Sequence, residues 1–306
     1  MLRKPSGLYQ VSICKIDTDY IGTNEYKRKL SLMIFYPSVN GNKACPYMDA
    51  EYQKNASLGQ YTDNGVDTYC FADGQLNPKN DKYPVVIYNH GLMGFQMEST
   101  VLCADIASEG YVVVSVGHPF GSGAVTYTNG QIFSSTVENS FDEHNLNNLG
   151  NLWKEDISCA IDYIYAIENC EIDSVFRGRL DVSSGVHLMG VSFGGCCSVA
   201  MALQNKYVID AINLDGGLFV DLDPVFKEKP ILVLRSFLNY KANRKIEQIG
   251  CVNVTVEKFR KVSHWEFSDG IYFSKKGKNN RDWADRISKK RADLCLDFIK
   301  SNKLRQ

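Results

Sequence analysis

From residue 84 onward, short continuous apolar runs alternate with amphipathic segments, and this alternation constrains the fold more than any other feature. The apolar runs are PVVIYN, YVVVSVGH, VHLMGV, YVIDAINL, PILVLRS and CVNVTVEKF. The helical segments are ESTVLCADIASEG, LWKEDISCAIDYIYAIEN, CCSVAMALQNK and the C-terminal DWADRISKKRADLCLDFIKSNK. Continuous apolar strands between helices are typical of a mostly parallel central sheet with helices on both faces. The sequence therefore predicts an α/β fold whose ligand site lies beyond the carboxyl ends of the strands.

The first 83 residues differ from the rest in pattern. Two early strands are predicted within GLYQVSIC and KLSLMIFYPS, and residues 37–83 then form a long polar stretch rich in Asn, Asp, Gly and Tyr. This stretch is expected to be a loop or insertion that either rims an active site or is decorative. Because no repeat or low-complexity linker divides the chain, we expect one domain over residues 1–306.

The charge balance argues against several classes of function. Lys and Arg number 34 against 35 Asp and Glu, so no global field attracts nucleic acid or an anionic membrane. No apolar run approaches the ~20 residues of a membrane helix, and residues 1–20 lack the apolar core of a signal peptide. We therefore expect a cytoplasmic protein. Its ten cysteines lack zinc-site spacing, so reduced thiols are expected, with no metal and no cofactor.

The segment VHLMGVSFGG, residues 186–195, is the candidate catalytic motif. Ser192 stands between Gly190 and Gly194, directly after an apolar strand and before a helix. In this context G-x-S-x-G forms a sharp turn that presents a nucleophilic serine, and the turn requires minimal side chains on either side. A strand before it, a helix after it and a further glycine at Gly195 favour this interpretation over a simple glycine-rich bend.

A serine nucleophile needs a histidine as general base and an acid that orients the histidine. His264, in the polar loop KVSHWEFSD, is the one histidine after Ser192 in the chain. Asp215 is our candidate acid because it ends the strand YVIDAINL, which is expected to lie beside the strand of the nucleophile. Asp221 and Asp223, farther into the loop, remain competitors, and Asp215 also suits a turn before glycines.

Acyl transfer also requires donors for the oxyanion. The backbone amide of Phe193, directly after the nucleophile, is one candidate. Leu92, in the loop HGLMGF after the strand PVVIYN, is the other, and His90 is expected to shape that loop rather than to carry protons. The apolar residues nearest to these groups are candidates for an acyl pocket, although any of them also suits the core. They are Met93, Phe95, Phe193, Leu218 and Phe219.

Four short blocks, NHGLMGF, GVSFGG, INLDGG and VSHWEF, together resemble the platelet-activating-factor acetylhydrolase family of serine α/β-hydrolases, of the plasma or isoform II type. The resemblance runs from about residue 28 to about residue 270 and includes VGHPFGSGAVTYTNGQ. It implies the α/β-hydrolase fold, a triad of Ser192, Asp215 and His264, and oxyanion amides from Leu92 and Phe193.

Two positions depart from the family pattern. Val191 precedes the nucleophile where His is common, and residues 216–217 are Gly-Gly with no aromatic residue. Both changes lie where they can reshape the acyl or leaving-group pocket. The mechanism therefore transfers more securely from the family than the substrate does.

The sequence predicts a serine ester hydrolase that works through an acyl-enzyme. The resemblance implies a phospholipid with a short or oxidised acyl chain as substrate, and contact with a membrane is at most peripheral. A general carboxylesterase for small or polymeric esters is the alternative enzyme, and a non-catalytic ligand-binding homologue is the alternative from another class. Presence of all three triad candidates argues against the non-catalytic protein.

Two further features are expected to be structural. Cys196 and Cys197 begin the helix after Ser192, where a helix N-terminus can lower a thiol pKa, but small buried packing residues are the simpler interpretation. The basic stretch 275–291 can contact lipid headgroups, but such stretches are usually solvated loop and helix faces. We expect the structural role for both.

Overall fold

The computed structural model describes residues 2–48, 50–53, 66–134, 143–237 and 250–303. In this part of the chain, twelve strands form one mixed sheet, and β8 and β9 form a separate pair. The strands are β1 (Gln10–Ile21), β2 (Lys27–Val39), β3 (Ala44–Pro46), β4 (Asp67–Phe71), β5 (Gln75–Leu76), β6 (Tyr83–Asn89), β7 (Val112–Gly117), β8 (Ala124–Thr126), β9 (Ile132–Ser134), β10 (Leu180–Asp181), β11 (Val186–Val191), β12 (Val208–Leu214), β13 (Ile231–Ser236) and β14 (Val254–Phe259).

The strand order explains where a site can form. The sheet runs β14-β13-β12-β11-β6-β7-β2-β1-β4-β3, with β10 beside β6 and β5 beside β2. From β14 to β7 every neighbouring pair is parallel, whereas β2 pairs antiparallel with both β7 and β1. The carboxyl ends of β6, β11, β12 and β13 therefore meet at one edge of the sheet, and the loops that follow them lie together.

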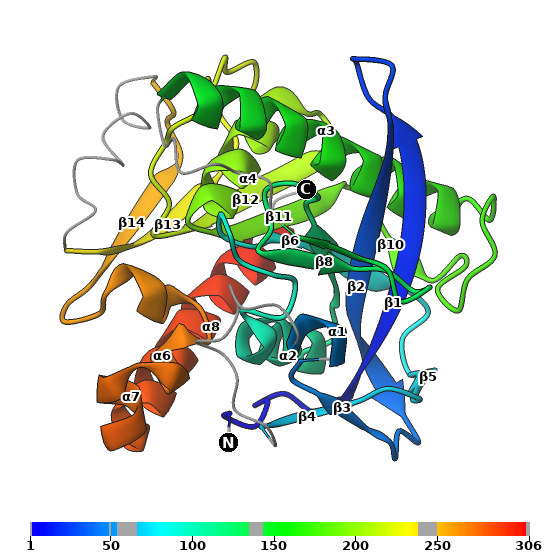
Figure 1. The fold of residues 1–306 in the computed structure, drawn as a ribbon, viewed down its shortest axis with the longest axis vertical. Helices are drawn as coiled ribbons and strands as arrows, with labels where there is room; N and C mark the ends of the chain where they lie inside the picture. Colours follow the sequence, from blue (N-terminus) through cyan, green and yellow to red (C-terminus); the bar gives the residue numbers. More distant parts are fainter. Residues whose placement is uncertain (1, 49, 54–65, 135–142, 238–249, 304–306) are drawn as a thin grey trace.

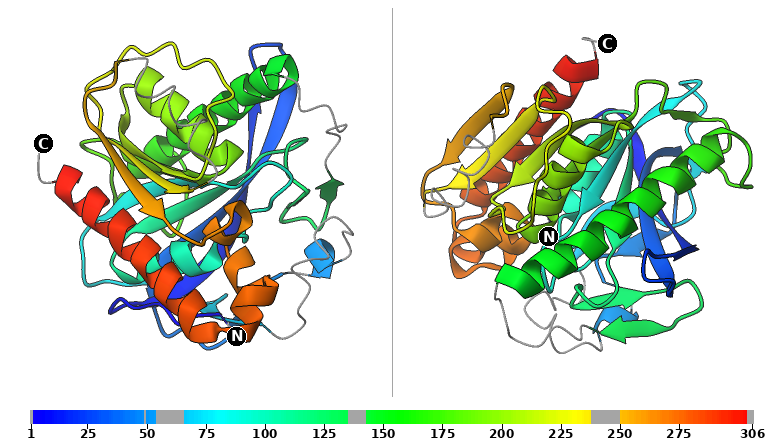
Figure 2. Two further views of the ribbon diagram at one scale, coloured as in Figure 1. Left: turned by 90° about the vertical axis from the view of Figure 1, so that its left-hand side faces the viewer. Right: turned by 90° about the horizontal axis from the view of Figure 1, so that it is seen from above.

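Helices cover both faces of the sheet. They are α1 (Ala50–Gln53), α2 (Thr100–Ser108), α3 (Glu143–Glu168), α4 (Phe193–Gln204), α6 (Gly270–Phe273), α7 (Lys275–Asn279), α8 (Arg281–Lys303) and the 3₁₀ helix η3 (His264–Phe267). One core layer holds the buried residues of α2 and α8, and the other holds those of α3 and α4. Figures 1 and 2 show these two helix pairs on opposite faces of the sheet. The predicted α/β class is confirmed.

The sequence pattern predicted the elements of the parallel half of the sheet well, and those of the polar stretch 37–83 less well. Each predicted strand and helix from residue 84 onward corresponds to an element of the structure. The interval 37–83, predicted as a long loop, instead contains β3, α1, β4 and β5, and β4 extends the sheet beyond β1. These strands are short and largely polar, so their alternation is too brief to mark them. Residues 54–65 of this interval lie outside the described residues.

No helix among the described residues is both long enough and apolar enough to span a membrane. The longest, α3, has a polar face. Its buried positions repeat at the helical period and pack into the core layer beneath it.

Candidate active site

Ser192 lies at the point where β11 ends and α4 begins, in a backbone conformation that few side chains adopt. Its φ is 54° and its ψ is −122°, in a region that is costly for residues other than glycine. At the glycine positions on either side, the neighbouring backbone leaves no room for a side chain. A Cβ at Gly190 would lie 2.7 Å from the Asn89 carbonyl oxygen, and one at Gly194 would lie 2.2 Å from it. The turn can therefore form only with glycines at these positions.

Ser192, His264 and Asp215 form one hydrogen-bonded chain. His264 Nε2 lies 2.9 Å from Ser192 Oγ, and His264 Nδ1 lies 2.8 Å from Asp215 Oδ2. Asp215 is fully buried, and its other oxygen accepts from the Ser236 amide at 2.6 Å. The buried carboxylate fixes the histidine tautomer, which leaves Nε2 free to take the serine proton. The imidazole itself is 51% exposed, so the chain opens toward solvent and substrate.

The loop that carries His264 is fixed from two sides. Ser263 and Glu266 form a capping box at the start of η3, with the Glu266 carboxylate accepting from the Ser263 amide at 2.7 Å. Arg291 of α8, which is buried, donates to the carbonyl oxygens of Glu266 and Ser268 at 3.4 and 3.3 Å. The S-x-x-E spacing of the capping box was present in the sequence, but our prediction did not use it.

The competing acids lie elsewhere. Asp221 is exposed and accepts from the Asn147 side chain of α3 at 2.6 Å. Asp223 is also exposed and follows in the same loop. The structure therefore brings Asp215, and neither competitor, to the ring of His264.

Residues 90–94, which follow β6, form what we call the oxyanion loop. The amide of Gly91 donates to Glu98, that of Met93 to the Gly121 carbonyl, and that of Gly94 to the Gly91 carbonyl. Within the described residues, the Leu92 amide has no such acceptor. Phe193 is the first residue of α4, where amides lack partners inside the helix. The two predicted oxyanion donors are thus among the amides for which the described backbone supplies no acceptor.

His90 orients the Leu92 amide through the shared peptide unit. Its Nδ1–H donates to the Gly91 carbonyl oxygen at 2.7 Å, and its Nε2 lies 2.7 Å from the hydroxyl of Ser122. Because the Gly91 carbonyl and the Leu92 amide belong to one planar unit, fixing the carbonyl fixes the amide. Burial lowers the pKa of His90 to about 3, so the ring is neutral at physiological pH. This placement agrees with the structural role that we predicted for His90.

A cavity of about 190 Å³ opens directly in front of Ser192. Its walls come from the oxyanion loop, from the end of β11 and from the loop around His264. The lining residues are Gly91, Leu92, Met93, Gly94, Glu98, Val191, Ser192, His264, Trp265 and Ser268. Of the apolar residues that we predicted for substrate binding, the cavity thus includes Met93.

The other predicted pocket residues lie off this cavity. Phe95 is fully buried because Tyr47 and Tyr52 pack against it, with ring centroids 6.1 and 5.3 Å from its own. Leu218 is buried in the core layer beneath α3 and α4. Phe219 is 45% exposed, and its amide donates to the Sγ of Cys196. The Phe193 side chain is buried in the same core layer as Leu218, with its ring centroid 5.0 Å from that of Trp153. For these four residues, proximity in sequence to the site did not bring the side chain to the cavity.

Glu98, Trp265 and Ser268 are cavity residues that the sequence analysis missed. Glu98 is the most unusual, because it is a carboxylic acid buried beside the nucleophile. Burial raises the pKa of Glu98 to about 7, although hydrogen bonds from the Gly91 amide and Tyr88 oppose the shift. A single buried glutamate has no local signature in a sequence, so only the fold reveals it.

The structure explains the glycine at position 216, which belongs to one of the two departures from the family pattern. A Cβ at Gly216 would lie 2.1 Å from the carbonyl oxygen of Ser192, so glycine is required there. Val191 is 4% exposed and lines the cavity, where it presents an apolar surface.

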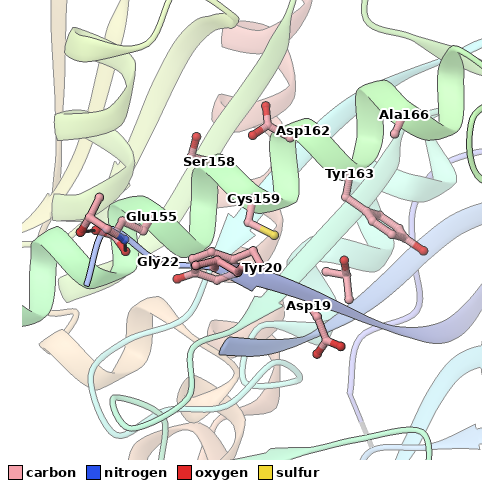
Figure 3. A pocket seen from close by; sticks show the side chains of 12 residues that line it. Asp19, Tyr20, Gly22, Glu155, Ser158, Cys159, Asp162, Tyr163 and Ala166 are labelled. Atoms are coloured by element: carbon pink, nitrogen blue, oxygen red, sulfur yellow. Dashed lines mark hydrogen bonds between the residues drawn. The ribbon is translucent and has the colours of Figure 1, made fainter. Parts of the chain in front are cut away.

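A larger hollow of about 470 Å³ lies away from this site, between the end of β1 and α3. Figure 3 shows Cys159, Asp162 and Tyr163 on α3, and Asp19 and Tyr20 on β1. Burial raises the pKa of the Cys159 thiol to about 12, which disfavours a reactive thiolate. None of the described residues that line this hollow belongs to the predicted site.

The two cysteines that begin α4 are packing residues, as we expected. Cys196 and Cys197 are fully buried, and burial raises the pKa of Cys197 well above its usual value. All ten cysteines are free thiols. Among the described residues, no three His, Cys, Asp or Glu side chains cluster so that they could hold a metal ion.

Comparison with known proteins gives a family match over most of the chain. Residues 2–262 match the family model described as platelet-activating factor acetylhydrolase, isoform II. The platelet-activating factor acetylhydrolase of Bos taurus is 26% identical over 172 residues, which cover 49% of this chain and 38% of that protein. The Cavia porcellus protein of the same name is 27% identical over 191 residues, covering 55% and 44%. The chain thus spans less than half the length of these curated relatives.

Solved structures share the architecture. A ferulic acid esterase from Streptomyces cinnamoneus has a TM-score of 0.78 at 19% identity, covering 98% of this chain and 92% of that one. The acylaminoacyl peptidase of Pyrococcus horikoshii has a TM-score of 0.52 at 15% identity, covering 95% of this chain and 42% of that one. At these identities the likeness establishes the fold alone.

Proposed function

The chain belongs to the platelet-activating factor acetylhydrolase isoform II family, and from this premise we propose that it hydrolyses phospholipid esters with a short or oxidised acyl chain through an acyl-enzyme. Its broader class, a serine ester hydrolase, is supported by the family match, and the structural neighbours support the α/β-hydrolase fold. The acyl-chain preference and the phospholipid leaving group are the new elements of the proposal.

In the proposed mechanism, His264 Nε2 takes the proton of Ser192 as Oγ attacks the ester carbonyl carbon. The amides of Leu92 and Phe193 hold the oxyanion of the tetrahedral intermediate. As the intermediate collapses, protonated His264 gives its proton to the leaving alcohol, and Ser192 keeps the acyl group. Water then attacks the acyl-enzyme with His264 as base, which frees the acid and restores the serine. Asp215 stabilises the imidazolium in both halves of the cycle.

The observation that carries the proposal is the hydrogen-bonded chain Ser192–His264–Asp215 at the floor of a small cavity. About 190 Å³ is well below the ~300–1,000 Å³ of sites that enclose drug-sized ligands. Such a volume suits an acetyl or similarly short acyl group better than a long chain. The 51% exposure of the His264 side chain leaves the leaving-group side open to a bulky alcohol such as a lysophospholipid.

The same exposure supports a second candidate, a general carboxylesterase for small or polymeric esters. An open leaving-group side places little restriction on the alcohol. The Streptomyces cinnamoneus neighbour, named a ferulic acid esterase, makes a feruloyl ester a reasonable comparison substrate. A non-catalytic binding role is the least supported candidate, because ligand binding alone does not require the complete hydrogen-bonded chain.

A panel of four esters tests the proposal. It contains 1-alkyl-2-acetylglycerophosphocholine, a long-chain phosphatidylcholine, p-nitrophenyl acetate and methyl ferulate, each assayed with the wild type and with Ser192→Ala. We expect kcat/KM for the acetyl phospholipid to exceed that for the long-chain lipid by at least about 100-fold, with no turnover by Ser192→Ala. Activity confined to the two small esters would favour the carboxylesterase. Absence of turnover on all four would favour a binding protein.

We also propose a cytoplasmic location. Ten free cysteines suit a reducing compartment, where disulfides rarely persist. Fractionation of the producing cell with an antibody to the chain tests this, and recovery in a secreted fraction would contradict it.

A further inference from the structure

Glu98 is a buried carboxylic acid in the active-site cavity that the catalytic steps above do not use. The residue is 4% exposed, and its Oε1 accepts from the Gly91 amide at 2.6 Å. Its Oε2 packs against Gly94, where an added Cβ would lie only 2.0 Å away. The carboxyl group is therefore held against two glycines of the oxyanion loop.

These contacts determine the conformation of Gly91. His90 and the Gly94 amide both bind the Gly91 carbonyl, which fixes the peptide unit after its Cα. Glu98 binds the Gly91 amide, which fixes the peptide unit before its Cα. With both units fixed, φ and ψ of Gly91 have one value each, although glycine is otherwise the most flexible residue. The direction of the Leu92 amide follows from that conformation.

We propose that Glu98 is a positioning residue for ester hydrolysis: it locks Gly91 so that the Leu92 amide points at the oxyanion. The inference rests on the proposed function, because the Leu92 amide matters only if an oxyanion forms. Glu98 acts through Gly91 and takes no proton from the substrate. Its backbone carbonyl also accepts from the Asp269 amide at 2.7 Å, which ties the oxyanion loop to the loop of His264.

The groups around Glu98 make this lock sensitive to pH. The Tyr88 hydroxyl of β6 lies 3.5 Å from Oε1, and the charge of His264 on η3 lowers the pKa of Glu98. Asp269, before α6, is a second buried carboxyl whose pKa is about 7 because of burial, partly offset by Arg291 of α8. For Glu98 burial dominates and raises the pKa to about 7. The carboxylate form, which is the stronger acceptor, therefore forms as the pH rises through neutrality.

Two substitutions at one position separate the hydrogen bond from the charge. Glu98→Ala removes the acceptor of the Gly91 amide, and Glu98→Gln keeps an acceptor of nearly the same shape without the charge. Asp105→Asn is the matched control, because Asp105 is a fully buried carboxylate of α2 that binds the Ser6 amide rather than a loop of the site. Circular dichroism and thermal unfolding establish that each variant is folded before kinetics with p-nitrophenyl acetate.

We expect Glu98→Ala to lower kcat by about 10–100-fold with little change in KM, because oxyanion donors act in the transition state. At pH 9, Glu98→Gln should retain at least about a third of wild-type kcat, and Asp105→Asn nearly all of it. Wild-type kcat for Glu98→Ala, or an equal loss in both Glu98 variants, would overturn the proposal. If Glu98→Ala does not fold, the Glu98→Gln pH profile below still decides the question.

The pH profile is the readout that a merely structural role would not change. In the wild type, protonation of Glu98 replaces the charged acceptor of the Gly91 amide by a neutral one, as Glu98→Gln does at every pH. The ratio of wild-type to Glu98→Gln kcat/KM should therefore fall from about two- to threefold at pH 9 to about one below pH 6, because the pKa of Glu98 is about 7. The ratio of wild type to Asp105→Asn should not change with pH. A wild-type to Glu98→Gln ratio that does not change with pH would contradict the proposed role.

The failure of this proposal is distinguishable from failure of the proposed function. If Ser192→Ala retains full hydrolysis of p-nitrophenyl acetate, the serine mechanism itself is wrong and the role of Glu98 falls with it. If Ser192→Ala is inactive and both Glu98 variants behave as the wild type, the positioning role alone is wrong.

Discussion

A histidine and an aspartate meet at each end of β12. At the carboxyl end, Asp215 contacts His264, whose side chain is half exposed and lies 2.9 Å from Ser192. At the amino end, His187 and Asp210 are register partners 3.0 Å apart, and both are buried. A histidine–aspartate contact alone therefore does not distinguish a candidate active site from a buried pair within the fold.

The surroundings of the two pairs explain the difference. The carboxyl-end pair has a cavity, a serine in a strained conformation and two available amides, all supplied by loops that follow parallel strands. The amino-end pair instead binds Asn302 of α8, whose side chain donates to Asp210 at 2.8 Å. That pair links the end of a helix to the sheet. We infer that the same residue types perform chemistry at one end and hold the fold together at the other.

The largest contrast is expected from removing each histidine. His264→Ala should lower kcat by on the order of 10⁵–10⁶-fold, because the general base is lost. Its free energy of unfolding should change little, because the His264 side chain is half exposed. His187→Ala should leave kcat nearly unchanged but lower the free energy of unfolding by roughly 2–4 kcal/mol, through a lost hydrogen bond and a cavity. Ester hydrolysis and urea denaturation of both variants measure the two quantities. A large loss of kcat in His187→Ala would show that the two ends are not separate.

The aspartates should show the same contrast at a smaller scale. Asp215→Asn should reduce kcat by on the order of 10³–10⁴-fold, since the amide no longer favours the productive tautomer of His264. Asp210→Asn should retain activity and lose stability. Asp221→Asn serves as a third variant, and loss of turnover in it, with Asp215→Asn active, would mean that the acid is Asp221.

Glycine substitutions test the backbone at each end. In Gly216→Ala the new Cβ would lie 2.1 Å from the Ser192 carbonyl, so the nucleophile must shift, and we expect kcat to fall about 10–100-fold. Gly185 precedes β11 at φ 112°, and its Cβ would lie 2.5 Å from the Tyr207 carbonyl. Gly185→Ala should therefore destabilise the fold without reducing kcat per folded molecule. Equal kcat losses in the two variants, corrected for the folded fraction, would contradict the comparison.

The smallest effect is expected for Asn302→Ala. The change removes one hydrogen bond to Asp210, so the free energy of unfolding should fall by about 1 kcal/mol while kcat stays constant. Thermal unfolding and an ester assay on the same preparation measure both. A stability equal to that of the wild type would mean that α8 does not anchor the amino ends of the strands through this residue.

The sequence was informative where short-range pattern and chemistry agree. The apolar runs and helical periods from residue 84 onward located the parallel half of the sheet, because strands buried on both faces must be apolar throughout. The rule that an acid and a histidine follow the nucleophile in the chain, together with glycine spacing, led to Ser192, Asp215 and His264. The structure brings these three residues together, and their catalytic roles stay predictions. The family assignment is confirmed by the match over residues 2–262.

What the sequence did not reveal depends on contacts between distant segments. Phe95 was predicted to line the acyl pocket, but Tyr47 and Tyr52 pack over it, and nothing local in the sequence indicates where these two tyrosines lie. The strands within residues 37–83 are stabilised by pairing with β1 and β2 rather than by their own pattern. Glu98 was missed for the same reason, because its burial depends on contacts with the oxyanion loop and with the segment that follows His264.

The most direct test of the central claim is covalent labelling of the folded protein with a fluorophosphonate probe, followed by peptide mass spectrometry. We expect a single adduct at Ser192, formed at the wild-type rate in Asp210→Asn and much more slowly in His264→Ala. An adduct on another residue, or no adduct on folded protein, would contradict the assignment of Ser192 as the nucleophile.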